Sequence, residues 1–502
     1  MSSGHLDQLL LGIADASLAA APEVGRLVVS GLSLDSRRVQ RGDAFFALRG
    51  GQAHGIAFAA GAVQRGARVV LAEAPAPAAL EPLDVPVLWV DSLHAQVSEI
   101  AARFYRRPSE SMRMVGVTGT NGKTSCVQLL AQALTLLGHR AASIGTLGAG
   151  VHGQLHEGER TTPDAVTVQA LLAEFRDADV SHVAMEVSSH ALEQGRVAAV
   201  DYEVAAFTNL TRDHLDYHGS MEAYGAAKAK LFAWPGLRSA AINVDDAFGR
   251  ELAAQLPADV QRLRFSMAGD DEAEVAASAI VTSAEGLAFL LRTPWGTRAL
   301  RSQLIGRFNV ANLLAVVACL GALGEPFARI VETVEQLQPV NGRMSRLGGA
   351  SGQPLVVVDY AHTPDALEQA LTAVRAHCAG KLICVFGCGG ERDAGKRPLM
   401  GEIAARLADV AIVTDDNPRG EDGDAIVAQI VAGMAAARAM AVERDRAAAI
   451  ADALQLARPG DAVLIAGKGH ETYQDGATGK HPFDDLAVAR AVLERIGREA
   501  RP

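Results

Sequence analysis

The stretch V-T-G-T-N-G-K-T-S at Val117–Ser125 decides the fold of the chain around it. An apolar run, Met112–Val117, comes before it, and a helical pattern over Lys123–Leu137 follows it and stops at Gly138. A strand, a glycine turn and a helix in this order are typical of the first unit of a parallel α/β sheet.

The turn has the chemistry of a phosphate loop. Gly119 and Gly122 allow backbone N–H groups to turn towards phosphate oxygens, and the N-terminus of the following helix attracts anions. Lys123 adds a positive charge for the β- and γ-phosphates, and the Thr124 hydroxyl suits Mg²⁺. Val117 stands where the usual G-x-x-x-x-G-K-[ST] pattern has its first glycine. We interpret the stretch as a shortened nucleotide-binding loop; the alternative is a glycine-rich turn with a surface lysine.

The last third of the chain alternates apolar strands with helices. The predicted strands are Leu355–Asp359, Leu382–Phe386, Val410–Thr414 and Ala462–Ala466, and the predicted helices are Pro364–His377, Lys396–Leu407, Gly423–Ala435, Arg446–Leu456 and Asp484–Ile496. Near-continuous apolar strands between helices indicate a parallel sheet covered on both faces. In such sheets ligands bind beyond the carboxyl ends of the strands, so the residues after each strand are the candidates for a site.

The first third has a similar alternation and a boundary of its own. Strands are expected at Arg26–Ser30, Asp43–Leu48, Ala67–Ala72 and Pro86–Val90, and helices at Gly55–Gln64 and Leu93–Tyr105. Arg107-Pro108 marks a boundary, because the residue before proline disfavours helix. Further along, Phe265–Arg301 is expected to be a β-rich insertion, with turn signals at Glu285-Gly286 and Pro294–Gly296. A helix is expected around Val310–Leu323.

The composition is that of a globular protein with more than one domain. The chain has 502 residues, a net charge of −11, 49% hydrophobic and 21% charged residues. An acidic chain lacks the electrostatic footprint of general nucleic-acid binding, and no apolar run approaches the length of a membrane span. Five cysteines without C-x-x-C spacing argue against a disulfide framework. The apolar N-terminus lacks a positively charged start, so we expect a helix there and a cytoplasmic location.

Polar groups follow two strands of the central region, His182–Val187 and Val204–Asn209. Glu186 lies near the carboxyl end of the first strand and is well placed to hold the Mg²⁺ of the phosphate loop. Asp213, His214 and Asp216 follow the second strand. Local pattern alone is equally compatible with a metal-binding loop and with a polar loop that caps a helix at Asp213.

Three loops at one edge of the C-terminal sheet carry charges of both signs. Arg392 follows one strand, Asp416 and Arg419 follow the next, and Glu471 follows a third. Arginine pairs with carboxylates and acidic side chains suit ammonium groups, so a ligand with two carboxylates and two amines would match. Surface ion pairs between loops are the alternative.

Seven motifs in order resemble the Mur ligases, the ATP-dependent amide ligases of peptidoglycan precursor synthesis. They are GTNGKT at Gly119–Thr124, MEVSSH at Met185–His190, NLTRDHLDYHG at Asn209–Gly219, AAK at Ala226–Lys228, GRFNVAN at Gly306–Asn312, NGRM at Asn341–Met344 and DYAHTPDAL at Asp359–Leu367. The resemblance implies an α/β fold of three domains. It places a smaller N-terminal α/β domain for the uridine nucleotide at residues 1–108, a central P-loop ATPase with a parallel-type sheet at 109–345 and a C-terminal Rossmann-like, amino-acid-binding domain at 346–502.

The resemblance also implies the residues of each site. ATP would contact Gly119, Thr120, Asn121, Gly122, Lys123, Thr124, Ser125, Asn309, Arg343 and Asp359. Mg²⁺ would be held by Thr124, Glu186, His214 and Lys228, the last of these carbamylated by CO₂. Without the resemblance, Lys228 reads as a solvated helix lysine, because an ammonium group has no lone pair for a metal. Lys123, Lys228 and His214 would be the catalytic residues.

DNPR at Asp416–Arg419 looks like the motif of family members that add meso-diaminopimelate to UDP-N-acetylmuramoyl-L-alanyl-D-glutamate. On that resemblance, diaminopimelate would contact Arg392, Asp416, Asn417, Pro418, Arg419, Gly467 and Glu471. The UDP-sugar dipeptide would contact Leu34, Ser36, Thr161, Thr162, Ser188, Gln194 and Arg196. We expect small-molecule substrates only, no nucleic acid, no membrane, and a monomer. A sister ligase that adds lysine, a folylpolyglutamate synthase-like enzyme and a non-catalytic nucleotide-binding regulator are the alternatives.

Overall fold

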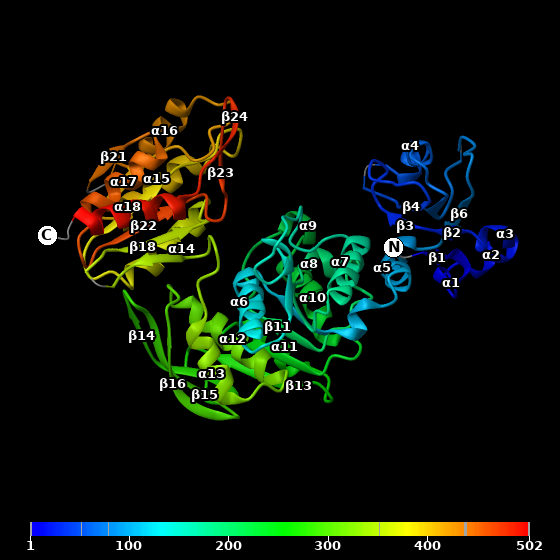
Figure 1. Cartoon of the computed structure of the whole chain (residues 1–502), viewed down its shortest axis with the longest axis horizontal. Helices are drawn as coiled ribbons and strands as arrows, with labels where there is room; N and C mark the ends of the chain where they lie inside the picture. The colour runs from blue at the N-terminus through cyan, green and yellow to red at the C-terminus, as the bar shows by residue number, and fades with distance from the viewer. Residues whose placement is uncertain (1–2, 52, 79, 351, 436–438, 500–502) are drawn as a thin grey trace. The chain divides into compact units, whose positions relative to one another are not determined.

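The computed structural model describes residues 3–51, 53–78, 80–350, 352–435 and 439–499. These residues form two compact units, residues 1–264 with 318–324, and residues 265–317 with 325–502. Each unit is built on parallel strands with helices between them (Figure 1). None of the helices within the described ranges is long and apolar enough to cross a membrane.

The N-terminal part contains a four-stranded parallel sheet in the order β3-β4-β5-β6. Its strands are β3 (Gly31–Ser33), β4 (Asp43–Ala47), β5 (Val69–Glu73) and β6 (Val87–Val90), with α4 (Ala59–Gln64) and α5 (Leu93–Phe104) as predicted. The single helix expected at the N-terminus is wrong. The chain there forms three short helices, α1 (Leu6–Leu9), α2 (Asp15–Ala20) and α3 (Pro22–Gly25). Gly12, with φ +73°, lies in the turn between the first two of them, and Pro22 starts the third.

The phosphate-loop region is a parallel sheet with the phosphate-loop strand near its middle. Six neighbouring strands of this sheet lie in the order β12-β11-β7-β10-β8-β9, and of these six only β9 at the edge runs antiparallel. The strands are β7 (Arg113–Thr118), β8 (Ala141–Gly145), β9 (Gly148–Val151), β10 (His182–Glu186), β11 (Val204–Phe207) and β12 (Ser239–Asn243). Helix α6 (Lys123–Leu136) follows β7 after the glycine turn. The strand–turn–helix prediction is therefore confirmed to within one residue.

The C-terminal sheet has the order β17-β18-β22-β19-β20-β21, with only the edge strand β17 (Ser345–Gly348) antiparallel. The other strands are β18 (Leu355–Asp359), β22 (Ala462–Ala466), β19 (Leu382–Phe386), β20 (Val410–Val413) and β21 (Met440–Val442). Alternate residues of these strands enter two separate apolar clusters. One cluster includes α14 (Pro364–Arg375), α15 (Lys396–Leu407) and α16 (Gly423–Ala432), and the other includes α17 (Arg446–Leu456) and α18 (Asp485–Glu499). The predicted coverage of both faces is confirmed.

The predicted β-rich insertion is an antiparallel three-stranded ribbon. Strands β14 (Val275–Ser283), β15 (Gly286–Thr293) and β16 (Gly296–Ser302) pair in sequence order. The turns fall at the two glycine positions that the sequence indicated. Helix α12 (Phe308–Ala322) then follows.

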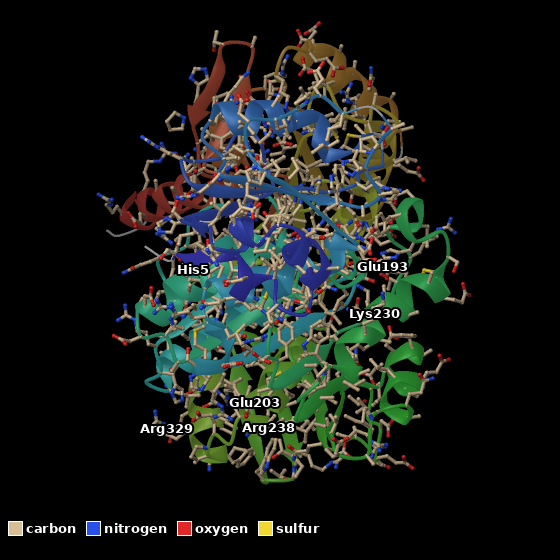
Figure 2. All side chains as sticks on the ribbon, turned by 90° about the vertical axis from the view of Figure 1, so that its right-hand side faces the viewer. His5, Glu193, Glu203, Lys230, Arg238 and Arg329 are labelled. Atoms are coloured by element: carbon tan, nitrogen blue, oxygen red, sulfur yellow. The ribbon has the colours of Figure 1, made fainter. Side chains whose placement is uncertain are left out.

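A buried histidine lies at the amino end of β10. The His182 side chain is 4% exposed, and its ring stacks on that of His139 with centroids 4.2 Å apart. Its Nδ1 lies 2.9 Å from Ser181 Oγ, whereas its Nε2 has no hydrogen-bond partner within the described ranges. Arg113 and Glu203, which form an ion pair, are the other charged groups near it; Figure 2 labels Glu203. Burial, assisted by His139, lowers the pKa of His182 from 6.5 to about 4.

This lowered pKa predicts an acid-sensitive fold. His182 is protonated more easily in the unfolded chain than in the folded one. The stability that neutral His182 gives the fold is therefore fully present above pH 6.5 and is lost as the pH falls towards about 4. Between about pH 7 and about pH 5 we expect His182 to account for about 2 kcal/mol of lost stability. Urea unfolding of the parent and of His182→Leu at both pH values measures it. An equal loss in both proteins would contradict the prediction.

Candidate active sites

The phosphate loop is held in its conformation by its own lysine and by a side chain that packs closely against its backbone. Gly122 adopts φ +86° directly before α6, and a Cβ at Gly119 would lie 1.9 Å from Thr208 Oγ1. The Lys123 ammonium group donates to the carbonyl oxygens of Gly119 and Thr120, both at 2.8 Å. The loop therefore presents backbone N–H groups and one cation at a helix N-terminus, as anion binding requires.

The loop is fixed by the polar run that follows β11. Asn209 accepts hydrogen bonds from Thr120 N at its carbonyl oxygen (2.8 Å) and from Asn121 N at its side chain (2.9 Å). Thr208 Oγ1 donates to the Asn121 carbonyl at 2.6 Å. The sequence placed this run near a metal, but it gave no sign that its first residues hold the phosphate loop.

Glu186 and Thr124 come together at the carboxyl ends of the strands. Glu186 is fully buried, and its Oε2 accepts from Thr124 Oγ1 at 3.0 Å. Thr146, which sequence reasoning missed, donates to both carboxylate oxygens, from its N–H at 2.8 Å and from its hydroxyl at 3.3 Å. A carboxylate and a hydroxyl next to a phosphate loop are oxygen donors of the kind that Mg²⁺ prefers.

Lys228 is not a solvated helix lysine. It lies in α10 (Met221–Ala229) with 1% of its surface exposed, and its Nζ donates to the Gly119 carbonyl at 2.9 Å. The same Nζ lies 4.2 Å from the centre of the Tyr224 ring. Burial, assisted by the nearby charge of Lys123, lowers the pKa of Lys228 from 10.5 to about 6. The amine is therefore mostly neutral at neutral pH, which is the form that reacts with CO₂.

His214 belongs to a cluster of rings beside this lysine. Its ring centre is 6.0 Å from that of Tyr224 and 4.9 Å from that of His190. His218 also stacks near Tyr224, at 5.1 Å, and its Nε2 lies 2.9 Å from Ser189 Oγ. His214 and Lys228 thus flank the same tyrosine ring. Within the described ranges, no group of three or more His, Cys, Asp or Glu side chains forms a metal-binding arrangement; the predicted set relies on a threonine and a modified lysine instead.

Five of the residues predicted for the UDP-sugar dipeptide gather around the end of β10. They are linked as follows: Thr162 Oγ1 donates to the Glu186 carbonyl and accepts from Ser188 N, Thr161 Oγ1 lies 3.0 Å from Thr146 Oγ1, and Arg196 donates to the Thr162 carbonyl and to Gln194 Oε1. Leu34 and Ser36 lie elsewhere, in the loop that follows β3 of the N-terminal sheet.

The two arginines predicted for the amino acid lie beside Gly389. A Cβ at Gly389 would lie 3.1 Å from Arg419 Nη1 and 3.8 Å from Arg392 Cγ. Arg419 Nη1 donates to the Gly390 carbonyl at 2.7 Å, and its Nε is 3.5 Å from Asp475 Oδ2. The structure therefore brings together the loops after β19 and β20, as the strand-end rule predicts.

The acidic groups of this site are joined by an amide and a lysine. Asn417 Nδ2 donates to Glu471 Oε2 at 2.9 Å, and Lys468 Nζ donates to Asn417 Oδ1 at 2.8 Å. Asp416 is 7% exposed, and burial raises the pKa of its carboxyl. Gly467, with φ +122°, lies next to Asp416. Lys468 lies between Gly467 and Glu471 in the loop after β22, but the sequence alone indicated no role for it.

The remaining residues predicted for ATP lie in the second unit. Asn309 is buried, donates to the Ile305 carbonyl at 2.7 Å and accepts from Asn312. Asp359 accepts from two backbone N–H groups, and burial raises the pKa of its carboxyl. Arg343 lies over the Tyr360 ring at 5.5 Å. In the structure Asn309 and Asp359 thus bond to nearby backbone groups, whereas Arg343 contacts an aromatic ring.

One site has a phosphate loop, and the other has charged loops at the strand ends. A nucleotide site together with a site for charged amines and carboxylates is what an ATP-dependent ligase of acids and amines requires. Three family models match the chain: "Mur ligase family, catalytic domain" at residues 28–105, "Mur ligase middle domain" at 117–320 and "Mur ligase, glutamate ligase domain" at 342–469. The chain belongs to the Mur ligase family, and the family predicted from the motifs is confirmed.

Two curated relatives show which members of the family this chain is similar to. A protein of Xanthomonas campestris pv. campestris (strain 8004) is 57% identical over 474 residues, which cover 94% of this chain and 96% of that protein. A protein of Pseudomonas aeruginosa is 53% identical over 467 residues, which cover 93% of this chain and 95% of that protein. Both are named UDP-N-acetylmuramoyl-L-alanyl-D-glutamate–2,6-diaminopimelate ligase.

Solved structures support the same fold. A structure of a ligase with that name covers 93% of this chain and 95% of its own, with 36% identity and a TM-score of 0.72. A Mycobacterium tuberculosis folylpolyglutamate synthase covers 74% of this chain and 92% of its own, with 19% identity and a TM-score of 0.58. The second likeness shows a shared fold alone. The predicted α/β architecture of the Mur ligases is confirmed.

Proposed function

We propose that this chain is the ATP-dependent ligase that adds meso-2,6-diaminopimelate to UDP-N-acetylmuramoyl-L-alanyl-D-glutamate in peptidoglycan precursor synthesis. Relatives of 53–57% identity over nearly the whole chain carry the name of that ligase. The observation that carries the proposal is the gathering of Arg392 and Arg419 beside Gly389, in a sheet whose neighbouring strand-end loops hold Asp416 and Glu471 around Lys468. This set matches a diamino-dicarboxylate.

The reaction needs charge neutralisation more than a protein nucleophile. The γ-phosphoryl group of ATP passes to the D-glutamyl γ-carboxylate, which becomes an acyl phosphate, and ADP leaves. The neutral amine of diaminopimelate then attacks the acyl carbon, loses a proton and displaces phosphate. Lys123 and the backbone N–H groups of Gly119–Ser125 bind the phosphates and offset the charge that develops on them.

The donor set fits Mg²⁺ and a modified lysine. Thr124 and Glu186, 3.0 Å apart, would hold one Mg²⁺, and His214 with a carbamate on Lys228 would hold a second. Bound Mg²⁺ ions would neutralise negative charge on the phosphate oxygens. The buried, mostly neutral amine of Lys228 supports the carbamate, because only the neutral form adds CO₂.

The remaining assignments extend the proposal to the whole chain. The UDP-sugar dipeptide is bound by Thr161, Thr162, Ser188, Gln194 and Arg196, together with Leu34 and Ser36. Asn309, Arg343 and Asp359 contact ATP. The domains are residues 1–108, 109–345 and 346–502, and the protein works as a cytoplasmic monomer. The gathering of five of these residues around Glu186 supports the first assignment.

Amino-acid-dependent phosphate release tests the proposal. With ATP, Mg²⁺ and the UDP-sugar dipeptide, we expect release with meso-diaminopimelate, and release with L-lysine lower by about a thousandfold or more, because lysine leaves Arg419 without a carboxylate. Arg419→Met is expected to lower kcat/KM for diaminopimelate by about a hundredfold. Steady-state rates with both amino acids measure these effects.

The control is Arg329→Met, which removes an exposed arginine of α13 (Phe327–Gln336) far along the chain from the loop (Figure 2). It is expected to behave like the parent. Equal release with lysine would leave a ligase of the family and overturn the specificity. Release with neither amino acid would favour the nucleotide-binding regulator.

A further inference from the structure

We propose that Lys468 is a positioning residue of the amino-acid site, which holds Asn417, Glu471 and Asp416 in the arrangement and charge state that bind the ammonium groups of the substrate. The inference rests on the proposed function, since it assigns a role within the diaminopimelate site. Lys468 directly follows Gly467 at the carboxyl end of β22.

Lys468 is fully buried among acceptors. Its side chain has no exposed surface, and its Nζ donates to Asn417 Oδ1 at 2.8 Å and to Glu471 Oε2 at 3.4 Å. The same Nζ lies 3.7 Å from Asp416 Oδ1. A buried cation is retained only where acidic and polar groups surround it, and here those groups are three of the predicted substrate contacts.

These contacts fix the orientation of the Asn417 amide. Asn417 Oδ1 accepts from Lys468 Nζ and from Asp475 N, the latter at 2.9 Å, while its Nδ2 donates to Glu471 Oε2 at 2.9 Å. An amide turned by 180° would place its NH₂ group against two donors. Lys468 thus selects the amide orientation that holds the Glu471 carboxylate in place.

Lys468 also contributes to the charge of the site. Asp416 is buried, which raises the pKa of its carboxyl; Arg446 and Lys468 counteract this rise, whereas Glu471 and Asp485 add to it. The Oδ1 atom of Asp416 has no hydrogen-bond partner within the described ranges. Without Lys468, Asp416 would take up a proton at a higher pH and would attract an ammonium group less strongly.

The test compares Lys468→Met with the parent and with Lys480→Met. Lys480 lies over the same Tyr473 ring as Lys468, at 3.8 Å against 5.6 Å, but it is exposed on β24 (Gly479–Pro482). For Lys468→Met we expect KM for diaminopimelate to rise by about tenfold to a hundredfold, with KM for ATP and for the UDP-sugar dipeptide unchanged. KM for diaminopimelate is also expected to start rising at a higher pH than in the parent as the solution is acidified.

A double-mutant cycle separates positioning from general support of the fold. In an Asn417→Ala background, Lys468→Met is expected to cost less than in the parent, because one of the three groups through which Lys468 acts is gone. If Lys468→Met does not fold, Lys468→Gln, which keeps a donor for Asn417 but no charge, replaces it. An unchanged KM for diaminopimelate, or an equal rise in all three KM values, would overturn the inference. If the parent itself releases no phosphate with diaminopimelate, the proposed function fails instead.

Discussion

Lys228→Ala is expected to lower the rate of phosphate release by about a hundredfold to a thousandfold, the cost of removing one group that stabilises the developing charge. The substitution removes the buried amine that carries the proposed carbamate and that donates to the Gly119 carbonyl. Initial rates at saturating ATP measure the loss. Short carboxylic acids such as acetate are expected to restore part of the rate, because a carboxylate can occupy the place of the carbamate.

Lys230 provides the matched control for this prediction. It stands two residues further along, is about half exposed and pairs with Glu193 at 2.6 Å; Figure 2 labels both side chains. Lys230→Ala removes an exposed lysine at the end of the same helix and is expected to leave the rate within about twofold, as exposed pairs contribute little. Loss of activity in Lys228→Ala without rescue by any carboxylic acid would argue against the carbamate and for a role in holding the phosphate loop.

Asp485→Ala is expected to destabilise the C-terminal sheet by about 3–5 kcal/mol, because it leaves a buried arginine without its partner. Asp485 and Arg446 begin α18 and α17, and neither side chain is exposed. Arg446 donates to both Asp485 oxygens at 2.7 Å and to the Ala466 carbonyl at 3.1 Å. Hydrogen exchange of the amides in α17 measures the free energy of opening.

Two comparisons sharpen this prediction. Glu368→Ala breaks the exposed pair of Glu368 with Arg406, whose atoms are 2.8 Å apart, and is expected to cost less than about 1 kcal/mol. The double variant Arg446→Met, Asp485→Leu is expected to recover most of the lost stability, since apolar groups of similar size can replace a buried pair. A single variant as stable as the parent would contradict the account of the pair.

Most of the fold could be predicted from the sequence because its strands are short apolar runs in a regular order. The phosphate-loop strand and helix and four strands of the C-terminal sheet were predicted to within one or two residues. The N-terminal helix was not, because an apolar and alanine-rich composition favours helix throughout, whereas Gly12 and Pro22 divide that segment. The hairpin of β23 (Tyr473–Gly476) and β24 carries little apolar pattern and was also missed.

The candidate sites could be predicted in outline, since parallel strands bring their carboxyl ends to one edge. Glu186 and Thr124 meet as expected, and so do the loops that carry Arg392 and Arg419. Thr146, Tyr224 and Lys468 were missed. Nothing in their local pattern distinguishes them from ordinary polar residues of loops and helices.

By itself, the sequence determined the family, the order of strands and helices, and the residue types available at the strand ends. These depend on hydrophobic periodicity, turn chemistry and motifs, which are local. Only the tertiary structure decided which polar side chains are buried together. Burial turns Lys228 into a mostly neutral amine and surrounds Lys468 with acceptors. Removal from water changes the charge and reactivity of a group, and it depends on segments that lie far apart along the chain.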